Sequence, residues 1–67
     1  MTAELHMMVA SLHGPNKSQT LRKLLEDPTH HNEPGVQSAV LYNANFGNAD
    51  VKGLAQQVAM QMKLIID

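Results

Sequence analysis

Cysteine and tryptophan are absent from this chain of 67 residues, and Tyr42 and Phe46 are its only tyrosine and phenylalanine. Without cysteine, neither a disulfide nor a zinc site built on thiolates can stabilise the fold. A domain of this size buries only about 60% of the surface that its unfolded chain exposes, so its stability is marginal. We therefore expect a single domain over residues 1–67 that gains stability by associating with another surface.

Charge of one sign is also scarce. Five lysines and arginines stand against six aspartates and glutamates, which leaves a net charge of -1 at pH 7. Only Lys17, Arg22 and Lys23 come close together, and this disfavours nucleic acid as a partner, because phosphate contacts need a positive surface. The small net charge imposes little repulsion between copies and suits a homo-oligomer.

Long apolar runs are missing as well. The longest one near the amino terminus covers residues 7–10, which is too short for the core of a signal peptide or for a membrane span. The lack of cysteine fits a reducing compartment. We expect a cytoplasmic protein with no membrane segment.

Three stretches rich in Gly, Pro, Asn and Asp, at residues 13–16, 28–35 and 43–48, divide the chain into four segments. The last segment is predicted to be a helix with Asn48 as its cap. Gly53 inside this helix suggests a close packing contact, since glycine is otherwise unfavourable there. The apolar residues of the segment recur at helical spacing: Val51, Leu54, Ala55, Val58, Met62, Ile65 and Ile66.

The second segment is also predicted to be a helix. Asn16 or Ser18 can cap its start, and Pro28 prevents its continuation. Its narrow apolar stripe consists of Leu21, Leu24 and Leu25.

Residues 36–46 are predicted to form a strand, since Val36, Val40, Tyr42, Ala44 and Phe46 alternate along one face. The rival interpretation is a helix capped by Asn32 with Pro34 in its first turn. Residues 2–12 fit either a helix or a strand. Because a lone strand needs a partner, we favour an α+β or α/β fold, built as a small strand-helix-strand-helix unit. The alternative is an all-α fold of four short helices.

No pattern in the sequence indicates catalysis. The chain lacks a Gly-x-Ser-x-Gly elbow and is short for enclosing a substrate pocket, so we predict no enzyme, no catalytic residue and no cofactor. We predict no metal site from His6, His13, His30 and His31, because adjacent loop histidines seldom converge on one ion. Residues 14–18 resemble a phosphate-binding loop, which leaves a small phosphate or nucleotide-binding module as one alternative.

The function favoured by these features is a protein-protein interaction module or small inhibitor that acts as a homo-oligomer and also binds another protein. Aromatic side chains commonly anchor such interfaces. The predicted binding face combines the last helix with the preceding strand: Tyr42, Phe46, Val51, Leu54, Val58, Met62 and Ile65.

Five short pieces of the second half form a further pattern: His30-His31-Asn32, Val40-Leu41, Asn45-Phe46, Leu54-Ala55 and Val58-Ala59-Met60. Over about thirty residues, these pieces resemble the core segment of elongation factor Ts. Asn45-Phe46 stands where that family has Asp-Phe. The resemblance implies a strand leading into this dipeptide, and a second alternative function as a nucleotide-exchange-like factor in which Phe46 contacts a translational GTPase.

Overall fold

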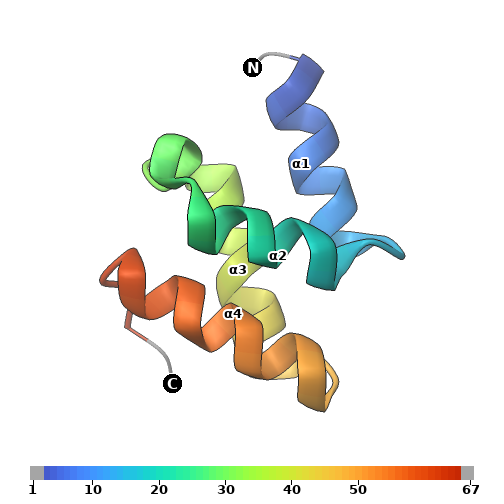
Figure 1. Ribbon diagram of the computed structural model, residues 1–67, viewed down its shortest axis with the longest axis vertical. Coiled ribbons are helices and arrows are strands. Elements are labelled where there is room, and N and C mark those ends of the chain that lie inside the picture. Colours follow the sequence, from blue (N-terminus) through green and yellow to red (C-terminus); the bar gives the residue numbers. More distant parts are fainter. Residues whose placement is uncertain (1–2, 66–67) are drawn as a thin grey trace.

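The computed structural model describes residues 3–65, which fold into helices joined by short loops (Figure 1). The elements in chain order are α1 (Ala3–His13), α2 (Lys17–Glu26), the short 3-10 helix η1 (Pro28–His30), α3 (Pro34–Phe46) and α4 (Ala49–Gln61). The described residues contain no strand, so the predicted α+β or α/β fold is wrong. The fold is the all-α alternative with four helices.

The wrong prediction concerns α3, where residues 36–46 were expected to form a strand. Val36, Val40 and Ala44 satisfy strand alternation, but they are also four residues apart and share one helix face, which is buried. Pro34 occupies the first turn, where its missing N–H costs nothing. Glu33 precedes the helix in the cap position without a side-chain cap bond, in place of the expected Asn32.

Residues 3–13, which the sequence left open between helix and strand, form α1. Leu5 and Leu12 are buried, and Met8 and Val9 pack against the core beside them. The helix ends where the amide of Gly14 donates a hydrogen bond to the carbonyl of Ser11. Thr2, the first residue of the predicted segment, lies outside the described residues.

The predicted helix in the second segment is confirmed as α2, with Leu21 and Leu24 buried. Asn16 precedes it in the cap position but its side chain makes no cap hydrogen bond. The helix ends before Pro28, which begins η1, and the carboxylate of Asp27 accepts a hydrogen bond from the amide of Thr29.

The predicted helix in the last segment is confirmed as α4, and Asn48 caps it through a hydrogen bond of 3.1 Å from the amide of Val51. Gly53 is exposed, so the expected close packing contact at this position is wrong. The chain leaves the helix after Gln61, and Lys63 adopts a positive φ of 61°. Ile65 therefore follows the helix, and Ile66 lies outside the described residues.

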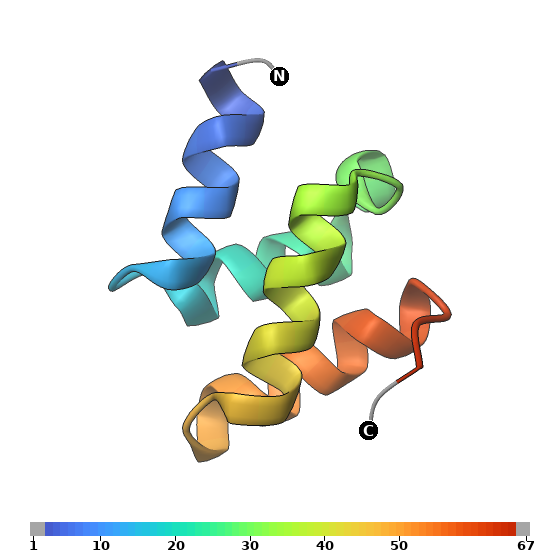
Figure 2. The same ribbon diagram turned by 180° about the vertical axis from the view of Figure 1, so that it is seen from behind.

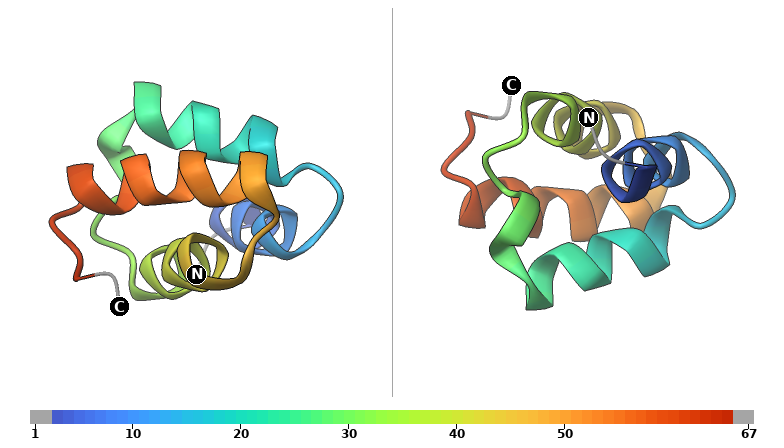
Figure 3. Two further views of the ribbon diagram at one scale, coloured as in Figure 1. Left: turned by 90° about the horizontal axis from the view of Figure 1, so that it is seen from below. Right: turned by 90° about the horizontal axis from the view of Figure 1, so that it is seen from above.

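The helices form two layers. Helices α1 and α3 make one layer, and α2 and α4 cross behind them as the other (Figures 2 and 3). Each helix contributes to the core between the layers, which includes Leu5, Leu12, Leu21, Leu24, Val36, Ala39, Val40, Ala44, Val51, Ala55, Val58 and Ala59. None of the helices in residues 3–65 combines the length and apolar character needed to cross a bilayer.

Candidate interaction surface

Tyr42 and Phe46 lie on the solvent side of α3. The inner face of this helix is occupied by small and branched side chains such as Val40 and Ala44, and this turns the aromatic residues outward. Tyr42 is 56% exposed and Phe46 is 73% exposed. The only tyrosine and the only phenylalanine of the chain are therefore both on the surface, one helical turn apart.

His13, at the end of α1, extends this pair. Its ring meets the ring of Tyr42 edge to face, with centroids 5.9 Å apart and an interplanar angle of 65°. The rings of Tyr42 and Phe46 are 5.2 Å apart and tilted by 50°. Both separations lie in the favourable range for aromatic pairs. We call the surface formed by His13, Tyr42 and Phe46 the aromatic ridge.

A buried asparagine sets the position of the ridge. The side-chain amide of Asn43 donates hydrogen bonds to the carbonyls of Leu12, at 2.9 Å, and Ala39, at 2.8 Å. The first bond ties the last turn of α1 to the middle of α3. Since His13 follows Leu12, and Tyr42 precedes Asn43, the same bond brings the two rings together.

The seven residues of the predicted binding face are divided by the fold. Tyr42 and Phe46 are brought together on the surface, whereas Val51 and Val58 are buried in the core on the inner side of α4. The structure places the remaining three in other surroundings: Leu54 and Met62 are half-buried against the core, and Ile65 is 87% exposed beyond the end of α4. The side chains exposed by α4 thus belong mainly to its other residues.

His13 is the ridge residue that sequence reasoning missed. No spacing rule connects it to Tyr42, because the contact depends on the packing of two helices. Phe46, which the resemblance to elongation factor Ts implies as a contact residue, is exposed at the end of α3. The segment that the resemblance implies to be a strand is this helix.

An apolar pocket lies between α1 and the start of α3. Its volume is about 270 Å³. The described residues that line it are Leu5, Val9, Glu33, Pro34, Gly35 and Val36. Most of these are apolar, and Glu33 adds a carboxylate.

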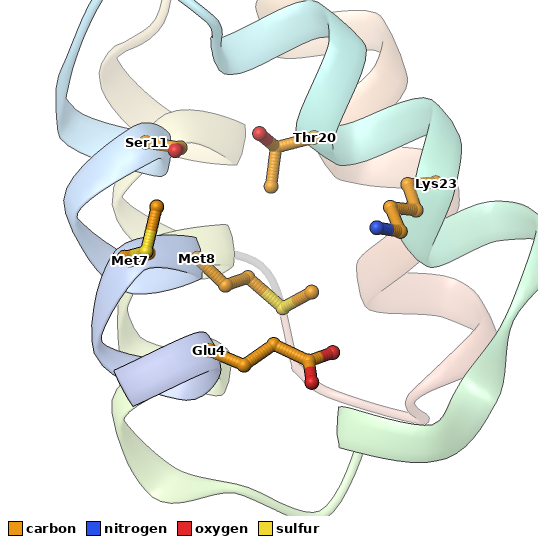
Figure 4. Close-up of a pocket in the computed structure, with 6 residues that line it drawn as sticks. All are labelled: Glu4, Met7, Met8, Ser11, Thr20 and Lys23. Atoms are coloured by element: carbon orange, nitrogen blue, oxygen red, sulfur yellow. The ribbon is translucent and has the colours of Figure 1, made fainter. Parts of the chain in front are cut away.

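A second pocket of about 410 Å³ lies between α1 and α2 (Figure 4). Met7 and Met8 supply its apolar part, and Ser11 and Thr20 supply hydroxyls. Glu4 and Lys23 extend toward it from opposite helices.

The loop predicted as an alternative phosphate site joins α1 to α2. The ammonium of Lys17 donates a hydrogen bond of 2.7 Å to the carbonyl of Gly14, so this cation stabilises the loop itself. An anion at the start of α2 would have to compete with that bond.

The histidines are separated by the fold. Nε2 of His31 lies 2.7 Å from the carbonyl oxygen of Leu24 near the end of α2, and Nε2 of His30 lies 3.6 Å from a carboxylate oxygen of Glu4. His13 belongs to the ridge. Among the described residues, no three histidine, aspartate or glutamate side chains gather as metal ligands.

No known family model matches the chain, and no curated protein or solved structure is detectably similar to it.

Proposed function

We propose that this chain is a non-enzymatic protein-interaction module that self-associates and binds its partner through the aromatic ridge. The observation that carries the proposal is the exposure of Tyr42 and Phe46 as an adjacent pair on one helix. We propose the cytoplasm as its location, on the ground that a chain without cysteine is suited to a reducing compartment.

Energetics support a binding role for this pair. Burying an aromatic side chain removes about 150–250 Å² from water. Burial of two such side chains in an interface would therefore contribute strongly to the free energy of association. Aromatic residues are enriched among the few positions that dominate binding energy. A tyrosine and a phenylalanine on the same exposed turn are suited to act as one such position.

The contacts between the rings add to this argument. The contact between Tyr42 and Phe46, and the edge contact with His13, limit the rotamers that these side chains adopt before binding. A surface that is already ordered loses less conformational entropy on association. The ridge is therefore prepared for binding in the free molecule.

Sedimentation equilibrium of the parent chain over a wide concentration range tests the proposal. We expect a reversible dimer. A variant combining Tyr42→Ala and Phe46→Ala should raise its dissociation constant by at least about tenfold, as loss of a dominant contact does.

Met60→Ala is the matched control, because Met60 is 72% exposed on α4 and is as apolar as the ridge. Its dissociation constant should stay within about twofold of the parent value. A parent chain that is monomeric at every concentration, or equal effects of the ridge and control variants, would contradict the proposal.

A further inference from the structure

One face of α3 carries both a protrusion and a hollow. Gly35, Ser38, Tyr42 and Phe46 are spaced by three and four residues, so they share a face of the helix. The aromatic side chains project from the carboxyl-terminal part of this face, and the pocket of about 270 Å³ lies at its start, beside Gly35. Gly35 and Phe46 are separated by roughly 16 Å along the helix axis.

The hollow fits the protrusion in size and chemistry. An apolar cavity of about 150 Å³ is enough to take a benzene ring. The pocket between α1 and α3 is larger, at about 270 Å³, and Leu5, Val9 and Val36 give it apolar walls. A phenyl ring is therefore a suitable occupant. Within one chain, Phe46 is at the far end of α3 and cannot fill the pocket itself.

The charge distribution favours a second copy as the partner. Helix α3 contains no acidic or basic residue along its whole length, Pro34–Phe46. Two copies of this helix can approach without like-charge repulsion, and interface cores are depleted of charged residues in general. Glu33, just before α3, lines the pocket, but α3 itself carries no charge that would attract a strongly charged partner.

From these observations we infer that two copies pair through antiparallel α3 helices, with Phe46 of each copy inserted into the pocket that Val9 and Gly35 line in the other. This inference rests on the proposed function and specifies its partner. A two-fold axis makes the contact reciprocal, because each copy donates one aromatic residue and one pocket. The axis passes near the middle of α3, where Ser38 of one copy faces Tyr42 of the other.

The size of the molecule shows how much of this face such a dimer would use. The molecule measures 29 × 25 × 19 Å, and α1 and α3 form one of its broad faces (Figure 2). A standard stable interface buries about 800 Å² on each partner. That is roughly a fifth of the 4364 Å² surface of this chain, so such a dimer would bury most of the face that α1 and α3 form.

A complementation experiment tests the reciprocal contact. Phe46→Ala removes the inserted ring, and Val9→Phe fills the pocket from α1. Each variant alone should dimerise at least about tenfold more weakly than the parent. An equimolar mixture should associate more tightly than either variant, because Phe46 of the Val9→Phe chain enters the open pocket of the Phe46→Ala chain. In this heterodimer, the filled pocket faces only alanine.

Circular dichroism of each variant checks that it is folded. Gly35→Leu is a second way to obstruct the pocket, and it favours the helical conformation of α3. A spin label on Asn32→Cys provides a measurement that leaves the contact residues unchanged. Asn32 is exposed just before the pocket, so the label should broaden amide signals near Gly47 in an unlabelled second copy.

The outcomes separate this inference from the proposed function. If the ridge variants weaken the dimer while Val9→Phe and Gly35→Leu do not, the proposed function stands and the insertion is wrong. A mixture that fails to recover association, or a label that leaves the amides near Gly47 unaffected, also overturns the reciprocal arrangement. A parent chain that stays monomeric overturns both.

Discussion

The side-chain amide of Asn43 in α3 donates a hydrogen bond to the backbone carbonyl of Leu12 at the end of α1, across 31 positions of sequence. Asn43 is buried, and its second hydrogen bond goes to the carbonyl of Ala39 in its own helix. A polar group buried in this way stabilises a fold only while its partners are in place. Asn43 therefore holds α1 against α3, and this packing determines how the rings of the aromatic ridge lie.

Replacing Asn43 with alanine should lower the free energy of unfolding by about 1–3 kcal/mol, because the Leu12 carbonyl loses its partner in a buried site. The contact between His13 and Tyr42 should loosen at the same time. Urea denaturation gives the first quantity, and chemical shifts of the two rings report the second.

Asn45→Ala is the matched control for that substitution. The amide of Asn45 also bonds to the carbonyl four residues earlier, that of Leu41, but it joins no second helix. Its replacement should change the free energy of unfolding by no more than about 0.5 kcal/mol. Equal effects at positions 43 and 45 would show that the bond between helices adds nothing.

Asn43 also explains why α3 was predicted as a strand. The helical face of this segment is Val36, Ala39, Val40, Asn43 and Ala44, and a polar residue in its centre interrupts the apolar pattern. The predicted strand also had a polar exception on its apolar face, Ser38, and its alternation leaves Asn43 on the opposite face. The burial of Asn43 depends on the Leu12 carbonyl, which only tertiary packing brings near. By contrast, the helices α2 and α4 have apolar stripes without such an interruption, and both were predicted correctly.

The candidate site could be predicted only in part from the sequence. Tyr42 and Phe46 were chosen because aromatic residues are scarce in the chain, and both are exposed. Val51 and Val58 were assigned to the same face, but an apolar stripe in sequence does not tell whether it meets the core or a partner. In so small a domain, this stripe lies in the core, where α4 packs against α2 and α3.

Two glycines should respond to alanine in opposite directions. A Cβ atom at Gly47, between α3 and α4, would lie 2.6 Å from the carbonyl oxygen of Asn43 and 2.9 Å from Cγ1 of Val51. Gly47→Ala should therefore cost about 1–3 kcal/mol through overpacking. A Cβ atom at Gly53 meets nothing within 4 Å, so Gly53→Ala should add about 0.5–1 kcal/mol.

Thermal unfolding of the two glycine variants beside the parent checks both signs in one experiment. A stabilised Gly47→Ala variant would mean that the turn between α3 and α4 relaxes without loss. A destabilised Gly53→Ala variant would show that the exposed face of α4 is in contact with something in solution.

The start of α4 depends on Asn48, whose side chain accepts a hydrogen bond from the amide of Val51. Asn48→Ala should lower the free energy of unfolding by about 1 kcal/mol, as the loss of a helix cap does. Asn16 holds the same position before α2 but makes no side-chain cap bond. Asn16→Ala should therefore have a smaller effect, and a larger loss at Asn16 than at Asn48 in urea denaturation would contradict this assignment.

The connection between α2 and α3 should make stability depend on pH in the acid range. The hydroxyl and the amide of Thr29 both donate hydrogen bonds to the carboxylate of Asp27, and these bonds, the hydroxyl's first, lower the pKa of Asp27 below its ordinary value of 3.8. Desolvation opposes this shift, and the charges of His30 and Lys23 make smaller contributions in the same direction as the hydrogen bonds.

Since the folded state lowers the pKa of Asp27, the ionised form stabilises the fold at any pH above the ordinary pKa of the unfolded chain. This contribution is lost as the pH falls through the lowered value in the folded chain. Asp27→Asn retains a side-chain acceptor for Thr29 but does not titrate there. Urea denaturation from about pH 6 to about pH 2 should show a shallower loss of stability for this variant than for the parent. Parallel curves would mean that the bonds to Thr29 do not distinguish the ionised from the protonated carboxyl group.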